Sequence, residues 1–218
     1  MQRPKQKIAE KLAEAQLFLN NASQDPFIAE CLAAFGYDTA RINQGFQLYQ
    51  HALEATRVHE REYARQYAAR DQFLEARRQL EEKHRPLLKI ARIAFQDDRA
   101  ADQLLHLSGR RKREFALWLN QLHAFYSNVQ QNNQLLEGLG EFNVTHGQIE
   151  EVVELLRAVE ETWYGYEREK GNAQAATKAR DAAVAELNTW MRNARPIARI
   201  AVAEQPQLLE KLGILVRS

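Results

Sequence analysis

The stretch at residues 85–94 reads RPLLKIARIA, and a closely similar stretch, RPIARIAVAE, occupies residues 195–204. In both, an Arg-Pro pair precedes the spaced apolar residues of an amphipathic helix. Proline lacks a backbone donor and disfavours helical backbone at the residue before it, so each pair predicts a new helix or a kink in an old one. The repetition of the motif indicates that the chain contains a duplication.

Residues across the whole chain match when the sequence is compared with itself. At a shift of 107 the matches are Arg3 with Arg110, Lys5 with Lys112, Phe18 with Phe125, Asn21 with Asn128, Leu32 with Leu139, Phe35 with Phe142 and Ile42 with Ile149. Beyond Glu60-Arg61-Glu62, which matches residues 167–169, the best shift becomes 110 and aligns the two Arg-Pro pairs. Keeping the shift at 107 instead aligns Ala-Arg-Ile-Ala at 91–94 with the same residues at 198–201. We interpret residues 1–108 and 109–218 as two repeat units of one intertwined body.

The chain is predicted to be all-α, because its 9 Gly and 5 Pro leave long uninterrupted stretches and no strand-like alternation occurs. In the first unit a helix is expected from about Lys5 to Asn20. Pro26 suits the first turn of a second helix, and Gly36 suits the residue that ends it. Asp38 or Thr39 is expected to cap the next helix.

A long helix is predicted from Thr39 to His84, since this stretch holds one Gly and no Pro. Apolar residues at alternating spacings of three and four form a seam along it and along its counterpart in the second unit. We therefore expect two long antiparallel, coiled-coil-like helices with short helices packed at both ends. In this arrangement residues 196–218 pack against residues 5–36.

The composition predicts a soluble, cytoplasmic protein. The 30 Lys and Arg nearly balance the 29 Asp and Glu, so no chain-wide field attracts nucleic acid or an anionic membrane. The first 23 residues mix Glu and Lys among apolar residues, unlike a signal peptide, and no stretch has the apolar length of a membrane span. The single cysteine, Cys31, permits no internal disulfide and is expected to be a small buried hydrophobe.

The sequence predicts no catalytic, cofactor-binding or metal-binding residues. Glu81 and His84 have the Glu-x-x-His spacing of di-iron bundles, but the chain contains no second copy, and an ordinary charged helix face is the preferred interpretation. The other five histidines show no spacing typical of a catalytic triad, and Gly138-Leu139-Gly140 lacks the lysine of a phosphate loop.

Arg110, Arg111, Lys112 and Arg113 form the densest basic run and are a weak candidate contact for an anionic partner. A solvated helix end is preferred, because no aromatic residue is interleaved for base stacking. The leading hypothesis is a non-enzymatic interaction or scaffold protein with an unidentified protein partner. The alternatives are a nucleic-acid-associated protein that uses the basic starts of its units, and an enzyme or ligand binder with a site between helices.

Three tryptophans and two tyrosines are candidates for a further contact surface, although burial in the core is the preferred interpretation: Trp118, Trp163, Trp190, Tyr164 and Tyr166. Arg70-Asp71 and Arg180-Asp181 are expected to form ion pairs between the long helices.

Overall fold

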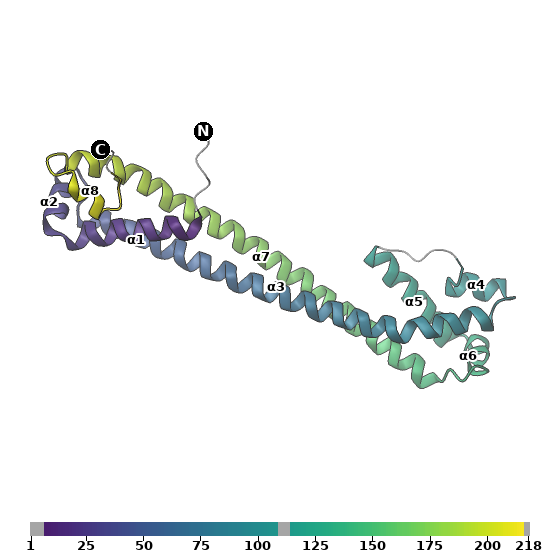
Figure 1. Cartoon of the computed structure of the whole chain (residues 1–218). Helices are drawn as coiled ribbons and strands as arrows, with labels where there is room; N and C mark the ends of the chain where they lie inside the picture. Colours follow the sequence, from purple (N-terminus) through teal and green to yellow (C-terminus); the bar gives the residue numbers. More distant parts are fainter. Residues whose placement is uncertain (1–6, 109–113, 216–218) are drawn as a thin grey trace. The chain divides into compact units, whose positions relative to one another are not determined.

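The computed structural model describes residues 7–108 and 114–215, and all regular secondary structure in these ranges is helical (Figure 1). The helices are α1 (Ile8–Gln24), α2 (Pro26–Ala34), α3 (Thr39–Ala94), α4 (Arg99–Leu105), α5 (Phe115–Gln131), α6 (Asn133–Gly140), α7 (His146–Ala201) and α8 (Gln207–Lys211). None of these helices has the length and apolar character needed to cross a membrane. The prediction of an all-α fold is confirmed.

The chain divides into two compact units that differ from the two halves of the sequence. Unit 1 comprises residues 1–65 and 170–218, and unit 2 comprises residues 66–169. Both α3 and α7 contribute to each unit. Unit 1 is therefore assembled from the two ends of the chain, whereas unit 2 is one continuous segment.

The core of unit 1 draws about equally on the two ends of the chain. Phe18 and Leu19 of α1 are fully buried in one cluster with Leu208 and Leu212 from the α8 region and with residues of α2, α3 and α7. The Asn21 side-chain amide donates to the Lys211 carbonyl oxygen at 2.8 Å. The predicted packing of the C-terminal segment against the first helices is confirmed for the residues described.

The Lys211 ammonium also binds the Asp25 carboxylate at 3.0 Å in unit 1. This hydrogen bond is the largest cause of the lowered pKa of Asp25, and the backbone N–H groups that Asp25 caps at the start of α2 lower it further. Asp25 therefore holds α2 and the C-terminal segment together while it remains ionised.

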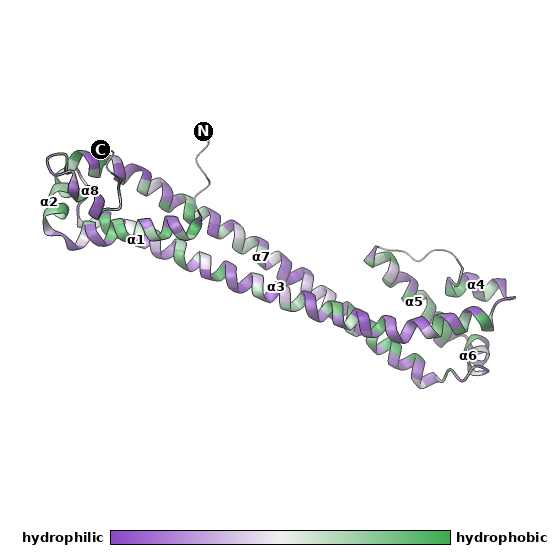
Figure 2. Ribbon diagram, viewed as in Figure 1, coloured by the Kyte–Doolittle hydropathy of each residue, from purple (hydrophilic) through white to green (hydrophobic). Residues whose placement is uncertain are grey.

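Unit 2 has its own hydrophobic core, formed by the end of α3, the start of α7 and the helices α4, α5 and α6. Phe125 and Tyr126 of α5 are buried in it together with Leu80 of α3 and Leu156 of α7. In both units hydrophobic residues gather where the short helices lie against the long ones (Figure 2).

Close contacts join α3 and α7 within each unit. In unit 1, Arg180 donates to His59 at 2.8 Å, and Gly45 of α3 lies against the Trp190 ring of α7. In unit 2, Phe73 stacks on Tyr166 and Lys83 binds Glu151 at 2.7 Å.

Neither Arg-Pro pair ends a helix. α3 continues through Pro86 and α7 through Pro196, so each helix has 56 residues and exceeds the predicted length of about 45. An interior proline costs roughly 3 kcal/mol in a helix. The turns that follow are held by burial, with Leu87, Leu88 and Ala91 in the core of unit 2 and Ala198 in that of unit 1. Tertiary packing therefore overrides the local signal.

The predicted ends of α2 and the predicted cap of α3 are confirmed. Pro26 is the first residue of α2, and Gly36, which follows the Phe35 C-cap, has a φ of 78°, a left-handed conformation that suits glycine. The Asp38 carboxylate accepts from the Arg41 backbone N–H at 2.9 Å and caps α3. Local sequence is sufficient for these boundaries because the capping interactions are themselves local.

Gly45 is a site where an added methyl group should destabilise unit 1. A Cβ there would lie 2.6 Å from Leu19 Cδ2 and 2.7 Å from two carbons of the Trp190 ring. Overpacking a core costs about 1–3 kcal/mol, against about 1 kcal/mol gained from better helix propensity. We expect Gly45→Ala to lower the free energy of unfolding, measured in urea, by about 1 kcal/mol.

Gly171 provides the matched control for this substitution. It also lies in a helix of unit 1, but a Cβ there meets no atom within 4 Å. Gly171→Ala is expected to raise stability by up to about 1 kcal/mol. Equal gains for both variants would contradict the tight packing at Gly45.

Candidate binding clefts

The residues singled out in the sequence do not form one site. Arg110, Arg111, Lys112 and Arg113 lie outside the described residues. Glu81 binds Arg77 at 3.0 Å and also Arg85, whereas the buried His84 Nδ1 hydrogen-bonds the Tyr126 hydroxyl at 2.7 Å. These two side chains therefore have separate partners. In the described ranges, no group of three or more His, Cys, Asp or Glu residues is placed to hold a metal ion.

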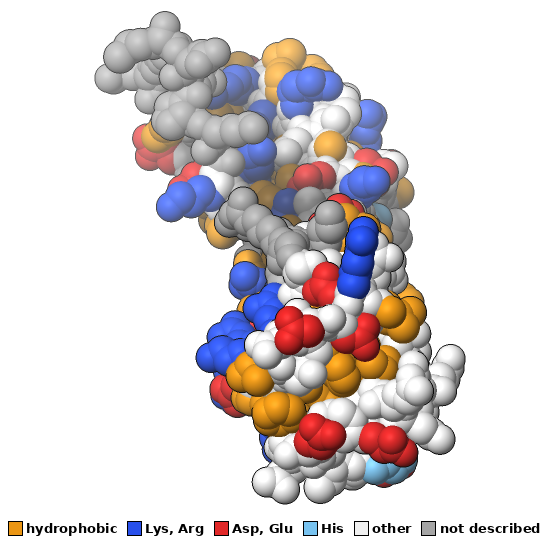
Figure 3. Space-filling model, turned by 90° about the vertical axis from the view of Figure 1, so that its right-hand side faces the viewer, with side chains coloured by type: hydrophobic (Ala, Val, Ile, Leu, Met, Phe, Trp, Pro, Cys, Tyr) orange, Lys and Arg blue, Asp and Glu red, His pale blue; other side chains and the backbone are white. Residues whose placement is uncertain are grey.

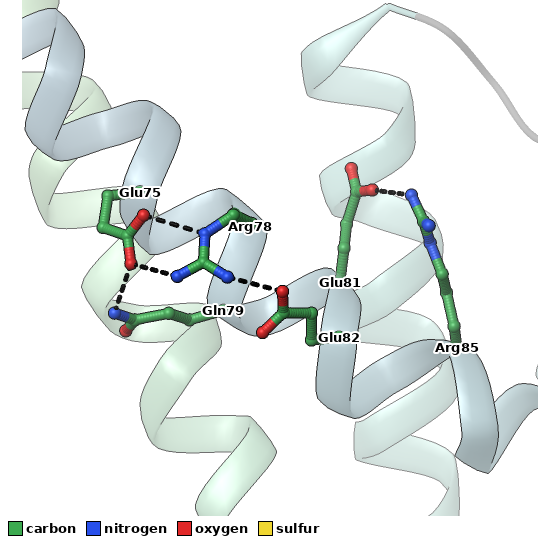
Figure 4. Close-up of polar contacts among 6 residues, drawn as sticks. All are labelled: Glu75, Arg78, Gln79, Glu81, Glu82 and Arg85. Carbon is green, nitrogen blue, oxygen red and sulfur yellow. Dashed lines mark hydrogen bonds and ion pairs between the residues drawn. The ribbon is translucent and has the colours of Figure 1, made fainter.

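A second set of charged side chains, separate from the Glu81 ion pairs, forms a network on the surface of α3. Arg78 binds Glu75 at 2.6 Å and Glu82 at 2.5 Å (Figure 4). Hydrogen bonds from Arg78 and then Gln79 lower the pKa of the Glu75 carboxyl to about 2, and the carboxylates raise the pKa of Arg78. Because a depressed carboxyl pKa stabilises the folded state only while the group is ionised, this contribution is lost as pH falls towards 2.

Most of the tryptophan and tyrosine residues considered as a contact surface lie in or near a core. Trp118 and Trp190 are buried, and Trp163 and Tyr166 are partly buried against the core of unit 2. Tyr164 differs, because 63% of it is exposed.

The Arg180-Asp181 pair does not bridge the long helices as an ion pair. Arg180 binds the adjacent Asp181 at 2.7 Å and donates to His59 Nε2 on α3. Because a guanidinium has no acceptor, the unprotonated Nε2 of His59 accepts this hydrogen bond. Burial, followed by the positive charge of Arg180, lowers the pKa of His59 and so favours its neutral form. The contact between α3 and α7 at this point is therefore a hydrogen bond to a neutral histidine, and the expected ion pair between the helices is wrong here.

A cleft of about 280 Å³ opens in unit 2 between the end of α3 and the start of α7. Pro86, Ile90 and Val144 give it apolar walls, and the Lys83–Glu151 ion pair lies at its polar side. Phe142, which also lines the cleft, is 43% exposed. In the view of Figure 3, hydrophobic side chains gather on the near end of the molecule among charged ones. The cleft can therefore accept apolar side chains flanked by polar groups.

Unit 1 has a cleft of about 470 Å³ between the start of α3 and the end of α7. Its aromatic side is made by Tyr37 and Trp190, whose ring centroids are 5.7 Å apart, and the Arg41 guanidinium lies 4.4 Å from the Tyr37 centroid. Trp190 Nε1 is buried without a hydrogen-bond partner among the described residues. A buried donor without a partner destabilises the folded state, so Trp190 Nε1 lowers the stability of this part of the unit 1 core.

The two clefts occupy corresponding positions in the sequence. Six residues that line the unit 1 cleft are related to residues of the unit 2 cleft by a difference of 107: Tyr37 and Val144, Arg41 and Gln148, Gln44 and Glu151, Thr189 and Glu82, Trp190 and Lys83, Asn193 and Pro86. The two clefts therefore share this offset in position, whereas their side chains differ in chemistry.

Sequence reasoning did not identify either cleft. The segments that form the unit 2 cleft are about 60 residues apart in the chain, and those that form the unit 1 cleft are more than 130 residues apart. No signal in the sequence marked them, because the corresponding lining residues differ in type, as with Tyr37 and Val144.

Comparison with known proteins gave no match to any protein family model, curated protein or solved structure. Inference about function therefore depends on the geometry of this chain.

Proposed function

We propose that this protein is a non-enzymatic helical interaction protein, built from two copies of one helical unit, which binds protein partners through its two clefts. The observation that carries the proposal is the recurrence of a cleft at positions that differ by 107. The occupant we favour is a protein segment that inserts apolar side chains, because apolar walls beside polar side chains are typical of such sites.

Helix boundaries support the duplication at a constant offset of 107. α1 and α5 have 17 residues each, α3 and α7 have 56 each, and both pairs begin and end 107 residues apart. This offset favours the alignment of the two Ala-Arg-Ile-Ala stretches over the alignment of the two prolines. The two Arg-Pro pairs then occupy different turns of corresponding helices.

Backbone conformation and side-chain contacts support the same offset. The four described residues with left-handed φ form two pairs that differ by 107: Gly36 with Asn143, and His106 with Gly213. The Asn21 amide donates to the residue 211 carbonyl, and the Asn128 amide donates to the Leu104 carbonyl, with both distances 2.8 Å. Compositional similarity between helices does not explain matching contacts of this kind.

The contacts between α3 and α7 support an antiparallel pairing of the long helices. Along α3 from Gly45 to His59, the contact on α7 moves back from Trp190 to Arg180. From Phe73 to Lys83 in unit 2, it moves back from Tyr166 to Glu151.

Site-specific photo-cross-linking in the native cells tests the proposal. A photoreactive residue at Gln148 or Gln44, each exposed in a cleft, should cross-link a specific protein, which is then purified and bound to the full chain. Phe142→Asp should weaken binding at the unit 2 cleft by about tenfold or more, as expected when a core contact of an interface is lost. A photoreactive residue at the exposed Tyr164, outside both clefts, is the control.

Two outcomes would overturn the proposal. One is the same cross-linking pattern from Tyr164 as from the clefts. The other is strong, salt-sensitive retention of nucleic acid that is lost when Arg110, Arg111, Lys112 and Arg113 are all replaced by Gln, which would favour the nucleic-acid-associated alternative.

A further inference from the structure

Unit 1 has a second cleft, and the side chains that line it carry an excess of positive charge. It has a volume of about 250 Å³ and lies between α1 and the last turns of α7. Four cationic side chains line it, whereas Glu14 is its one acidic residue. The cationic residues are Lys11 of α1 and Arg192, Arg195 and Arg199 of α7.

The three arginines form a stripe along α7. Their spacings of three and four residues place them on one helix face, where like charges repel by about 0.2–0.5 kcal/mol per pair. Glu14 binds Arg195 at 2.5 Å, and Arg199 donates to the Leu215 carbonyl at 3.4 Å. Among the described residues, neither Lys11 nor Arg192 has a carboxylate partner. The cleft thus brings together cations that its own acidic residue does not neutralise.

The corresponding positions of unit 2 carry fewer cations, although Arg92 stands at the position of Arg199 and Gln121 at that of Glu14. Residue 85, which is 107 before Arg192, is also an arginine, but it is bound by Glu81 from the same helix (Figure 4). Trp118 stands at the position that corresponds to Lys11, and the buried Leu88 at the position of Arg195. The positive charge is therefore more concentrated in the unit 1 cleft, with four cations, than at the corresponding positions of unit 2, with two.

We propose that the cleft between α1 and the end of α7 binds a compact multivalent anion that carries phosphate groups. Arginine guanidinium groups suit phosphate because they donate planar, paired hydrogen bonds. Several cations around one cleft favour a multivalent ligand over a single carboxylate. The phosphate groups can belong to a soluble molecule or to a lipid headgroup. This site is separate from the clefts proposed above to bind protein.

Calorimetric titration of the full chain with pyrophosphate at low ionic strength tests the proposal. Arg192→Gln and Lys11→Gln should each weaken binding by about fivefold or more, since each removes a charge that faces the ligand. Glu14→Gln should tighten binding severalfold, because Arg195 then becomes available. Arg85→Gln, at the corresponding place in unit 2, is the control and should leave the affinity unchanged.

A second experiment distinguishes a soluble ligand from a lipid headgroup. In it, phosphatidylcholine vesicles with and without phosphatidic acid replace pyrophosphate. Binding to acidic vesicles alone, with the same order of variants, would assign the site to a lipid headgroup. An absence of binding in both experiments, or affinities that Arg85→Gln lowers as much as Arg192→Gln, would overturn the proposal. Thermal unfolding of each variant separates a loss of binding from a loss of fold.

Discussion

Residues 1–108 expressed alone are expected to lack a cooperative fold, although they comprise a complete repeat as defined from the sequence. In the full chain, about half of the buried residues in the unit 1 core come from residues 183–214, among them Leu187, Met191 and Leu209. Eight of these residues are Val, Leu, Ile or Met. At about 1.5–3 kcal/mol for each buried side chain, their loss is as large as or larger than the roughly 5–15 kcal/mol by which whole domains are stable. Circular dichroism during thermal unfolding should show no sharp transition.

Residues 66–169 provide the matched control for this experiment. This segment is of nearly the same length, but it contains all the residues of the unit 2 core. We expect it to fold alone and to unfold in one cooperative transition. A compact, cooperatively melting monomer of residues 1–108 would contradict the assembly of unit 1 from both ends of the chain.

The sequence predicted the helical elements better than their partners. Pro26, Gly36 and Asp38 fix helix ends through interactions with residues a few positions away, so these boundaries could be read locally. Pro86 carries an equally clear local signal, yet α3 continues through it. The burial of Leu87 and Leu88 depends on residues distant in the sequence, which a local pattern does not contain.

The candidate sites were less accessible to sequence reasoning. The spacing of Arg192, Arg195 and Arg199 marks a basic helix face, but the importance of this face depends on Lys11 and Glu14, which reach the cleft from the other end of the chain. The basic run at 110–113 is evident in the sequence because its charges are adjacent. Charges three and four residues apart share one helix surface only if the segment is helical, which the charges alone do not show.

The buried pair of His84 and Tyr126 is the site of the second large expected effect. His84 is 1% exposed and Tyr126 is also 1% exposed, and the Tyr126 hydroxyl bonds His84 Nδ1 at 2.7 Å. Tyr126→Leu removes this bond and part of the ring's contacts with His84 and Phe125. Creating a cavity and taking a partner from a buried polar group together cost about 3–5 kcal/mol.

Unit 1 supplies the substitution expected to rescue this loss. At the positions that differ by 107 from His84 and Tyr126, it has Met191 and Leu19, both buried in its core. The double variant His84→Met/Tyr126→Leu replaces the polar pair by the apolar pair of unit 1. No buried imidazole then loses its partner, and the flexible methionine side chain fills part of the cavity. We expect the double variant to recover about 1–3 kcal/mol of the unfolding free energy lost by Tyr126→Leu, measured by urea denaturation of the full chain. Additive losses from the two substitutions would show that the corresponding positions in the two units do not have equivalent packing environments.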